Sequence, residues 1–272
     1  LMSFGELPSK NALVAQVLGT FLAPISSLAV VLNQILEQKG GAPAEAAAEA
    51  KTEAEGVMKI DRAETLRYLR MGGVEPDAPL ARRLARVEDD VRAACRPAAY
   101  WRLETVAAGE ETGDLVLGPL AVRSRDLARV LAGCRHAFLF CATLGAGVDA
   151  LLRRYSQTSG ADALMAQAAA TAAIEGWCDA CAEKLLAEPA VAGERLRMRF
   201  SPGYGDLPLA VQRPLLQILD SARRAGIVLT ETCLMIPSKS VSAIIGVGPE
   251  PAAPCPAGCR ACSKTECEYR TC

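Results

Sequence analysis

A run of small and acidic residues divides this chain into separate parts. Residues 40–56 read GGAPAEAAAEAKTEAEG, and no side chain in this run is large and apolar enough to anchor it in a core. Low-complexity segments of this kind are typical of solvated linkers or tails. A Pro-rich hinge near residue 249 separates a further short segment from the rest. The 272 residues therefore predict three parts, 1–57, 58–248 and 249–272.

The first part has the pattern of an amphipathic helix followed by a linker. Leu13, Val17 and Phe21 begin a series of apolar residues at helical intervals, which Pro24 interrupts. The segment LPSKNALVAQVLGTFLAPISSLAVVLNQILEQKGG resembles the C-terminal end of the bacterial large-subunit stalk-base ribosomal protein. That resemblance implies a helix that binds dimers of the acidic stalk protein. It does not extend to the globular rRNA-binding part of that family.

The junction between the first two parts suggests two joined coding sequences. The chain begins at Leu1, whereas Met58 opens MKIDRAETLRYLRMGG, which reads like a genuine protein start. We therefore expect residues 1–57 to be a fused segment that is able to bind partner helices but unable to assemble a stalk base.

Helices and strands are mixed in residues 58–248, without the regular alternation of a βαβ fold. Apolar residues at helical spacing predict helices over 63–69, 80–91, 162–186 and 211–224, with a further short one from Ser124. Short apolar runs punctuated by glycine predict strands within 105–122, 137–145 and 229–248. We expect an α+β fold with a mixed or antiparallel sheet and flanking helices, plus the N-terminal amphipathic helix and a C-terminal Cys-rich tail.

Charge and cysteine usage limit the partners and the compartment. Thirty basic and 31 acidic residues leave a net charge of −1, so the chain lacks the field that attracts nucleic acid. The apolar run 13–36 is broken by Gln16, Pro24 and Asn33 and is too interrupted to span a membrane. Eleven cysteines, an odd number, without a signal peptide favour a reducing compartment. We expect a soluble cytoplasmic protein that contacts neither nucleic acid nor membrane.

The last eighteen residues have the spacing of a metal-binding loop. They read CPAGCRACSKTECEYRTC, in which the first four cysteines follow one another at two to four intervening residues. Thiolates at this spacing can surround one ion or cluster. Cys255, Cys259, Cys262 and Cys267 fit an iron–sulfur cluster or a structural zinc, with Cys272 as a spare ligand. The spacing does not decide between the two metals.

Three smaller motifs have a structural interpretation beside a chemical one. Cys178 and Cys181 form a CxxC, but inside an apparent helix, where buried small residues are the favoured interpretation over a redox pair. The segment 142–149, ATLGAGVD, has glycines between a strand and a helix and fits a tight turn better than a phosphate loop. His136, the single histidine, is expected on the surface at a strand entry.

The loop RFSPGYGDLP, residues 199–208, is the candidate ligand-binding segment. Pro202 and Gly203 predict a tight turn that places Arg199 and Tyr204 on either side of it. A guanidinium pairs with a carboxylate, and a tyrosine ring can face a sulfonium cation. From the residue types alone, a purely structural turn is the favoured interpretation.

A resemblance over residues 58–248 changes that interpretation. RFSPGYGDLPLAVQ, LTETCLMIPSKSVSAIIG and LFCATLGAGVDALLRRY look like the activation domain of cobalamin-dependent methionine synthase, especially its stand-alone versions from anaerobic bacteria, which also end in a Cys-rich tail. The family's R-x-x-P-G-Y motif falls on Arg199, Pro202, Gly203 and Tyr204. The resemblance implies that the arginine and the tyrosine hold S-adenosylmethionine. It also implies an acidic contact, for which Asp61, Asp89 and Asp90 are the candidates.

The function that this resemblance implies is reactivation of a corrinoid methyltransferase of the methionine synthase type. The chain would be a methyltransferase component in methionine biosynthesis that presents S-adenosylmethionine for reductive methylation of cobalamin, with a flavodoxin- or ferredoxin-type electron donor. Its single histidine lies in RHAF, outside any D-x-H-x-x-G cobalamin motif, so the cobalamin is expected on a partner subunit. The alternatives are an iron–sulfur electron-transfer adaptor for corrinoid proteins and, ranked third, a ribosomal stalk interaction protein.

Overall fold

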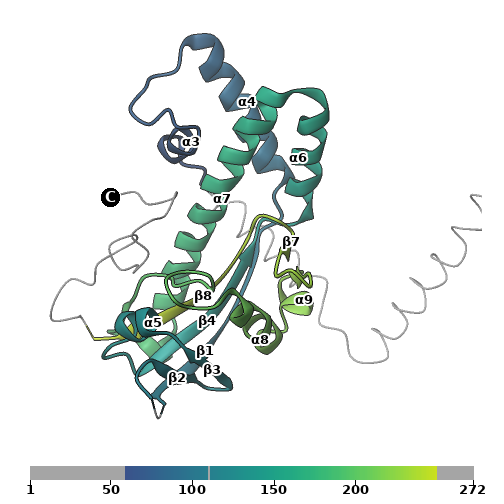
Figure 1. The fold of residues 1–272 in the computed structure, drawn as a ribbon. Helices are drawn as coiled ribbons and strands as arrows, with labels where there is room; N and C mark the ends of the chain where they lie inside the picture. Colours follow the sequence, from purple (N-terminus) through teal and green to yellow (C-terminus); the bar gives the residue numbers. More distant parts are fainter. Residues whose placement is uncertain (1–58, 110, 250–272) are drawn as a thin grey trace, which may run out of the picture. The chain divides into compact units, whose positions relative to one another are not determined.

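A computed structural model describes residues 59–109 and 111–249 (Figure 1). The chain separates into two units, Leu1–Thr52 and Glu53–Cys272, and the described residues all belong to the second. The expected N-terminal amphipathic helix and the Cys-rich tail lie outside the described residues. In the described part, no helix combines the length and the apolar character that a membrane crossing needs.

An antiparallel sheet forms the centre of the described unit. Its strand order is β3-β2-β1-β4-β8-β5, and β4 pairs along its whole length with β1 on one side and β8 on the other. A separate two-stranded pair joins β6 to β7. The strands are β1 (Ala98–Ala108), β2 (Asp114–Leu117), β3 (Leu120–Arg123), β4 (His136–Thr143), β5 (Arg195–Leu196), β6 (Val228–Leu229), β7 (Met235–Ile236) and β8 (Ser240–Gly248).

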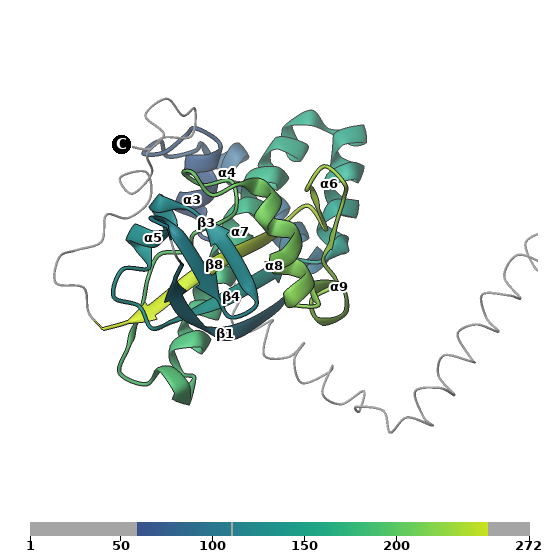
Figure 2. The same cartoon turned by 60° about the horizontal axis from the view of Figure 1, so that its bottom comes forward.

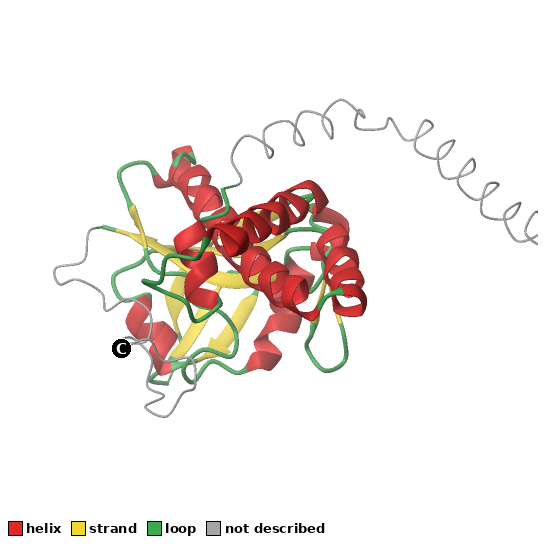
Figure 3. Ribbon diagram, turned by 90° about the horizontal axis from the view of Figure 1, so that it is seen from above, coloured by secondary structure: helices red, strands yellow, loops and turns green. Residues whose placement is uncertain are grey.

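Helices cover both faces of this sheet, as the views in Figures 2 and 3 show. The helices are α3 (Arg62–Tyr68), α4 (Ala78–Ala94), α5 (Arg125–Val130), α6 (Ala146–Thr158), α7 (Gly160–Leu186), α8 (Gln212–Ile218) and α9 (Ser221–Arg224), with 3₁₀ turns η2 (Pro189–Val191) and η3 (Leu209–Val211). The first core cluster joins α3, α4, α6 and α7 to one face, and the second joins α5 and α8 to the other.

Strand β4 shows why the sheet needs a layer on each face. Successive side chains of a strand point to opposite faces. Phe138 and Phe140 belong to the first cluster, whereas Leu139 and Cys141 belong to the second, and all four are almost completely buried. A strand that is apolar on both faces is stable only in the middle of a three-layer arrangement.

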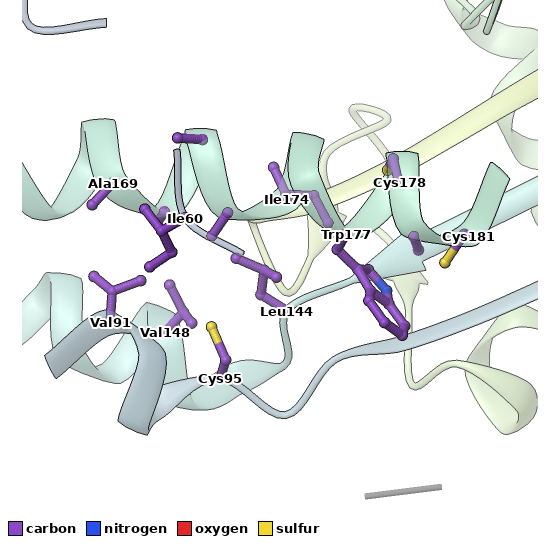
Figure 4. Packing of buried hydrophobic residues seen from close by; sticks show 14 of the residues in the cluster. Ile60, Val91, Cys95, Leu144, Val148, Ala169, Ile174, Trp177, Cys178 and Cys181 are labelled. Carbon is purple, nitrogen blue, oxygen red and sulfur yellow. The ribbon is translucent and has the colours of Figure 1, made fainter. Parts of the chain in front are cut away.

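Helix α7 packs closely because one side of it consists of small residues. Ala166, Ala169, Ala170 and Ala173 are fully buried in the first cluster, and Figure 4 shows Ala169, Ile174 and Trp177 among the packed side chains of this region. At Gly176, an added Cβ would lie 2.5 Å from the carbonyl oxygen of Lys59, so the chain before α3 can lie against the helix only at a glycine. Gly176 thus allows the N-terminal end of the described unit to lie beside α7.

The α+β fold with an antiparallel sheet and flanking helices is confirmed. One helix prediction was wrong, because the helix expected over 211–224 is broken into η3, α8 and α9. Asp220 between α8 and α9 has a left-handed backbone with φ of 49°. An apolar period cannot reveal such a break, because buried residues lie before it, at Leu215, Leu216 and Leu219, and after it, at Ser221 and Ala225.

Candidate functional site

The segment 195–207 contacts strand β8 at two points and then forms a tight turn. Strand β5 pairs with the end of β8, and Phe200 forms an isolated bridge with Ile244 of β8. Three backbone hydrogen bonds within 201–207 then hold a compact turn. Gly203 has a φ of 93°, a conformation that residues with a side chain rarely adopt. The tight turn expected at Pro202–Gly203 is therefore present.

A cleft of about 1040 Å³ opens beside this turn. It extends from α7 across the edge of β8 to the start of α8, and the loop between β6 and β7 forms its other wall. It is lined by Glu175, Ala182, Leu196, Arg197, Met198, Arg199, Ser201, Pro202, Tyr204, Leu209, Gln212, Thr230, Cys233, Leu234, Met235, Ile236, Ser238, Ser240, Val241, Ser242 and Ile245. Three of the four predicted ligand residues, Arg199, Pro202 and Tyr204, thus share one cleft, and Gly203 shapes the turn between them.

Arg199 is held by two carboxylates of α7. Its Nη2 lies 2.6 Å from Oε2 of Glu175, and its Nη1 lies 2.6 Å from Oδ1 of Asp179. Burial alone would lower the pKa of Arg199, but its bonds to Asp179 and Glu175 outweigh that effect, so the pKa is raised and the group stays charged. A guanidinium carries five N–H donors, and these contacts leave others for a ligand.

A second, smaller hollow of about 480 Å³ shares Glu175 with the cleft. It is lined by Lys59, Asp61, Glu64, Arg67, Tyr68, Ala172, Glu175, Gly176, Asp179, Ala180 and Glu183. Five of these side chains are carboxylates and two are basic, and Arg67 is paired with Glu64. This hollow would therefore favour the binding of a positively charged group.

Only one of the three candidate acids lies in this region. Asp61 lines the smaller hollow, and its carboxylate also accepts from the backbone N–H of Ala63 at the start of α3. Asp89 pairs with Arg92 on the surface, and Asp90 accepts a hydrogen bond from the hydroxyl of Tyr155. The geometry thus favours Asp61 over Asp89 and Asp90 as an acid near the cleft.

Four of the large apolar side chains that line the cleft are exposed. Tyr204 is 54% exposed, Leu234 65%, Ile236 51% and Leu209 47%. The ring of Tyr204 stands edge-on to Phe200, with ring centroids 6.1 Å apart. Contiguous exposed apolar groups on a folded domain are typical of a surface that another molecule covers. We call these four side chains the apolar rim.

Asp206 is a residue that the sequence reasoning missed. Its carboxylate accepts hydrogen bonds from the Ser124 hydroxyl and from the backbone N–H groups of Arg125 and Asp126, at the start of α5. Burial would raise the pKa of Asp206, but these bonds outweigh it and hold the pKa below its usual range. The loop of Arg199 and Tyr204 is therefore fixed to a helix some 80 residues earlier in the chain. The Asp in PGYGDLP is visible in the sequence, but its partner is not.

Gln212 is a second residue that was missed. It is 4% exposed and lines the cleft, and its Oε1 has no hydrogen-bond partner among the described residues. A glutamine at a helix start carries no sequence signal of such burial.

The smaller motifs have the structural roles expected of them. Cys178 and Cys181 are buried on α7, and burial raises the pKa of the Cys181 thiol to about 12 (Figure 4). Burial likewise raises the pKa of Cys178, although nearby Arg199 opposes the shift. At Gly147 an added Cβ would lie 2.3 Å from the carbonyl oxygen of Ala94, so ATLGAGVD brings α6 against the end of α4. His136 is at the start of β4, as expected, but it is half-buried and not fully on the surface.

The predicted metal ligands cannot be placed. Cys255, Cys259, Cys262 and Cys267 lie outside the described residues. Within residues 59–109 and 111–249, no group of three or more His, Cys, Asp or Glu side chains could hold a metal ion. The metal tail therefore stays a prediction.

Two regions of the chain match models of known protein families. Residues 135–253 match the family model described as "Vitamin B12 dependent methionine synthase, activation domain". The resemblance expected from the sequence is confirmed. The matched region contains β4, α6, α7, the turn at 201–207 and β8.

A solved structure supports the fold. The described unit is similar to the crystal structure of the MetH reactivation domain bound to AdoHcy, with a TM-score of 0.52 and 18% sequence identity. The similarity covers 68% of this chain and 71% of that one. At this identity the comparison establishes the shared fold.

The first part of the chain matches a different family. Residues 7–52 match the family model "Ribosomal protein uL10 C-terminal region". The chain is 51% identical over 49 residues to the large ribosomal subunit protein uL10 of Polynucleobacter necessarius subsp. necessarius (strain STIR1). The match covers 18% of this chain and spans only 27% of that protein's length.

Proposed function

We propose that this chain binds S-adenosylmethionine in the cleft beside Arg199 and Tyr204 and presents it to a corrinoid held by a partner protein. The observation that carries the proposal is the convergence of Arg199, Pro202 and Tyr204 on one cleft, in a region that matches an activation domain family. The solved structure of similar fold was determined with AdoHcy bound, which is the product form of the proposed ligand.

The charge of the cleft suits this ligand. S-adenosylmethionine has a carboxylate, an ammonium group and a sulfonium, so its net charge is positive. Arg199 would pair with the carboxylate, while Glu175 and Asp179, the two carboxylates that Arg199 already contacts, would supply negative charge near the ammonium group. Asp61 lines the neighbouring hollow, which shares Glu175 with the cleft. An attraction between opposite charges in a partly buried cleft is screened less by salt than one on an open surface.

The chemistry supplied by the bound ligand is transfer of its sulfonium methyl group to the reduced cobalt of the partner's cobalamin. The role of this chain is to hold the methyl donor in a fixed orientation at an accessible mouth. The apolar rim, Tyr204, Leu209, Leu234 and Ile236, is the surface on which the corrinoid partner would dock. The electron would come from a flavodoxin- or ferredoxin-type donor, and the predicted metal tail, with an iron–sulfur cluster or zinc, would lie next to this domain in sequence.

The test follows formation of methylcobalamin by its absorption spectrum. An oxidised corrinoid protein, a reductant and S-adenosylmethionine are mixed with and without this chain. We expect methylcobalamin to accumulate faster with the chain present and the chain alone to make no methionine. Equal rates with and without the chain would contradict the proposal.

A second candidate function concerns the first part of the chain. The first part of the chain is 51% identical to a uL10 protein over 49 residues. This similarity favours binding of the acidic stalk protein by the first part of the chain. Co-purification of the full chain with the acidic stalk protein, lost when residues 1–52 are deleted, would support it. The two candidates use separate regions of the chain and do not compete.

A further inference from the structure

Arg199 makes an ion pair through each of its two terminal nitrogens. Its Nη1 lies 2.6 Å from Oδ1 of Asp179, and its Nη2 lies 2.6 Å from Oε2 of Glu175. Hydrogen bonds between an ionised donor and an ionised acceptor are stronger than neutral ones. One positive guanidinium between two negative carboxylates leaves an excess of negative charge at this point. A third carboxylate, brought by a ligand, therefore gains little at Arg199 for as long as both bonds stay closed.

The two carboxylates that hold Arg199 differ in exposure. The side chain of Asp179 is 73% exposed, whereas that of Glu175 is 43% exposed. An exposed carboxylate is readily solvated when it leaves a cation, so an ion pair of this kind contributes little to stability. The bond to Asp179 is therefore the easier of the two to open.

The hollow beside α7 has room for the side chain of Asp179 once it leaves Arg199. Arg199 lines the cleft, and Asp179 lines the hollow of about 480 Å³, so the bond between them joins the two spaces. Rotation of the Asp179 side chain into the hollow opens this bond and needs no movement of the helix. Glu175, one turn earlier on α7, lines both spaces and can keep its own bond to Arg199.

We propose that Asp179 is an internal competitor, which occupies Arg199 while the cleft is empty and yields it to the carboxylate of S-adenosylmethionine on binding. This inference rests on the proposed function and concerns the regulation of the same site. Glu175 keeps Arg199 in position in both states. Because Asp179 returns to Arg199 as the ligand leaves, it shortens the retention of the S-adenosyl product after methyl transfer.

Calorimetric titration of the full chain with two probes tests this inference. The probes are S-adenosylhomocysteine and its decarboxylated analogue, in which hydrogen replaces the carboxylate. Both keep the ammonium group, so any attraction between Asp179 and the ammonium cancels when the two affinities are compared. The wild type should prefer S-adenosylhomocysteine. Asp179→Asn should raise this preference about two- to fivefold, because the charge that competes for Arg199 is gone.

Two further variants show whether Asp179 acts through Arg199. In an Arg199→Ala background, the added change Asp179→Asn should leave the preference unaltered, since no guanidinium remains to compete for. Glu183→Gln is the matched control, because Glu183 lies one turn further along α7 and lines the same hollow but is not one of the carboxylates bonded to Arg199. It removes the same charge, and solvent screening should keep its preference within about twofold of the wild-type value.

The direction of the change in Asp179→Asn decides the outcome. An unchanged or weakened preference for the carboxylate, in a variant that melts at a temperature close to that of the wild type, would overturn the inference. Asp179→Ala is the second variant if the asparagine does not fold, and the same increase is expected of it.

The outcomes also distinguish this inference from the proposed function. If the wild type binds neither probe, the proposed function fails and the role of Asp179 with it. If the wild type binds both probes equally well, Arg199 does not hold the carboxylate, and the inference is wrong although S-adenosyl binding stands. If the wild type prefers the carboxylate and Asp179→Asn does not strengthen that preference, only the role of Asp179 is wrong.

Discussion

At the scale of single residues, burial decides which thiols of the described unit can react. Cys178 and Cys181 are each 1% exposed on α7, and burial raises the pKa of the Cys181 thiol to about 12. The thiolate is the reactive form, so a thiol of such pKa is inert near neutral pH. Cys233 differs, because it is half-buried and lines the cleft.

We therefore expect iodoacetamide at pH 8 to label Cys233 of the native protein while Cys178 and Cys181 stay unmodified, as measured by peptide mass spectrometry. Saturating S-adenosylmethionine should slow the labelling of Cys233, because the ligand would cover it in the cleft. Rapid labelling of Cys178 and Cys181, or a disulfide between them, would instead support a redox CxxC.

At the scale of elements, the binding loop depends on its attachment to α5. Asp206 accepts bonds from Ser124 and from the first N–H groups of that helix. Because its pKa in the folded protein is below the ordinary 3.8, the ionised carboxylate stabilises the fold above about pH 4. That contribution is lost as the pH falls through the folded-state pKa.

Replacing Asp206 with asparagine should lower the free energy of unfolding by about 1 kcal/mol at pH 7. The effect is no larger because the carboxylate is exposed and solvent screens its interactions. The difference from the wild type should shrink as the pH falls below about 4. Urea unfolding at several pH values measures both effects. Asp89→Asn, an exposed carboxylate with an i,i+3 partner, is the control and should change stability by less than about 0.5 kcal/mol. A difference that stays constant with pH would show that the charge of Asp206 is not involved.

Elements and motifs differ in how far the sequence predicts them. Helix α7 and strand β4 follow from apolar period and length, and the turn at Pro202–Gly203 follows from its residue types. The break at Asp220 and the attachment of Asp206 to α5 depend on contacts between distant residues, which local patterns do not contain. For the same reason the pairing of Arg199 with Glu175 was not predicted.

At the scale of the whole molecule, the sheet and both core clusters of the described unit are built from residues that precede the Cys-rich segment in sequence. Strand β8 ends at Gly248, and the last buried residue that the two core clusters contain is Val247 of this strand. In the described part, no group of three or more His, Cys, Asp or Glu side chains could hold a metal ion. Metal binding, if it follows the cysteine spacing, depends on Cys255, Cys259, Cys262 and Cys267.

Deleting residues 254–272 should therefore remove bound metal while the circular dichroism spectrum and the cooperative thermal transition are retained. Metal content is measured by elemental analysis of the full and the truncated chain, purified in the same way. An iron–sulfur absorption band in the full chain would favour an electron-transfer role for the tail, and zinc would count against it. Metal that persists in the truncated chain would point to the cysteines of the described unit.

The central claim is that the cleft beside Arg199 binds S-adenosylmethionine, and calorimetric titration of the full chain tests it most directly. We expect saturable binding by the wild type and a loss on the order of ten- to a hundredfold in affinity for Arg199→Ala, because a charge-assisted contact to the ligand carboxylate is removed. Arg223→Ala, which breaks a surface ion pair with Asp220 outside the cleft, should bind like the wild type. No binding by the wild type, or unchanged affinity in a folded Arg199→Ala, would contradict the account.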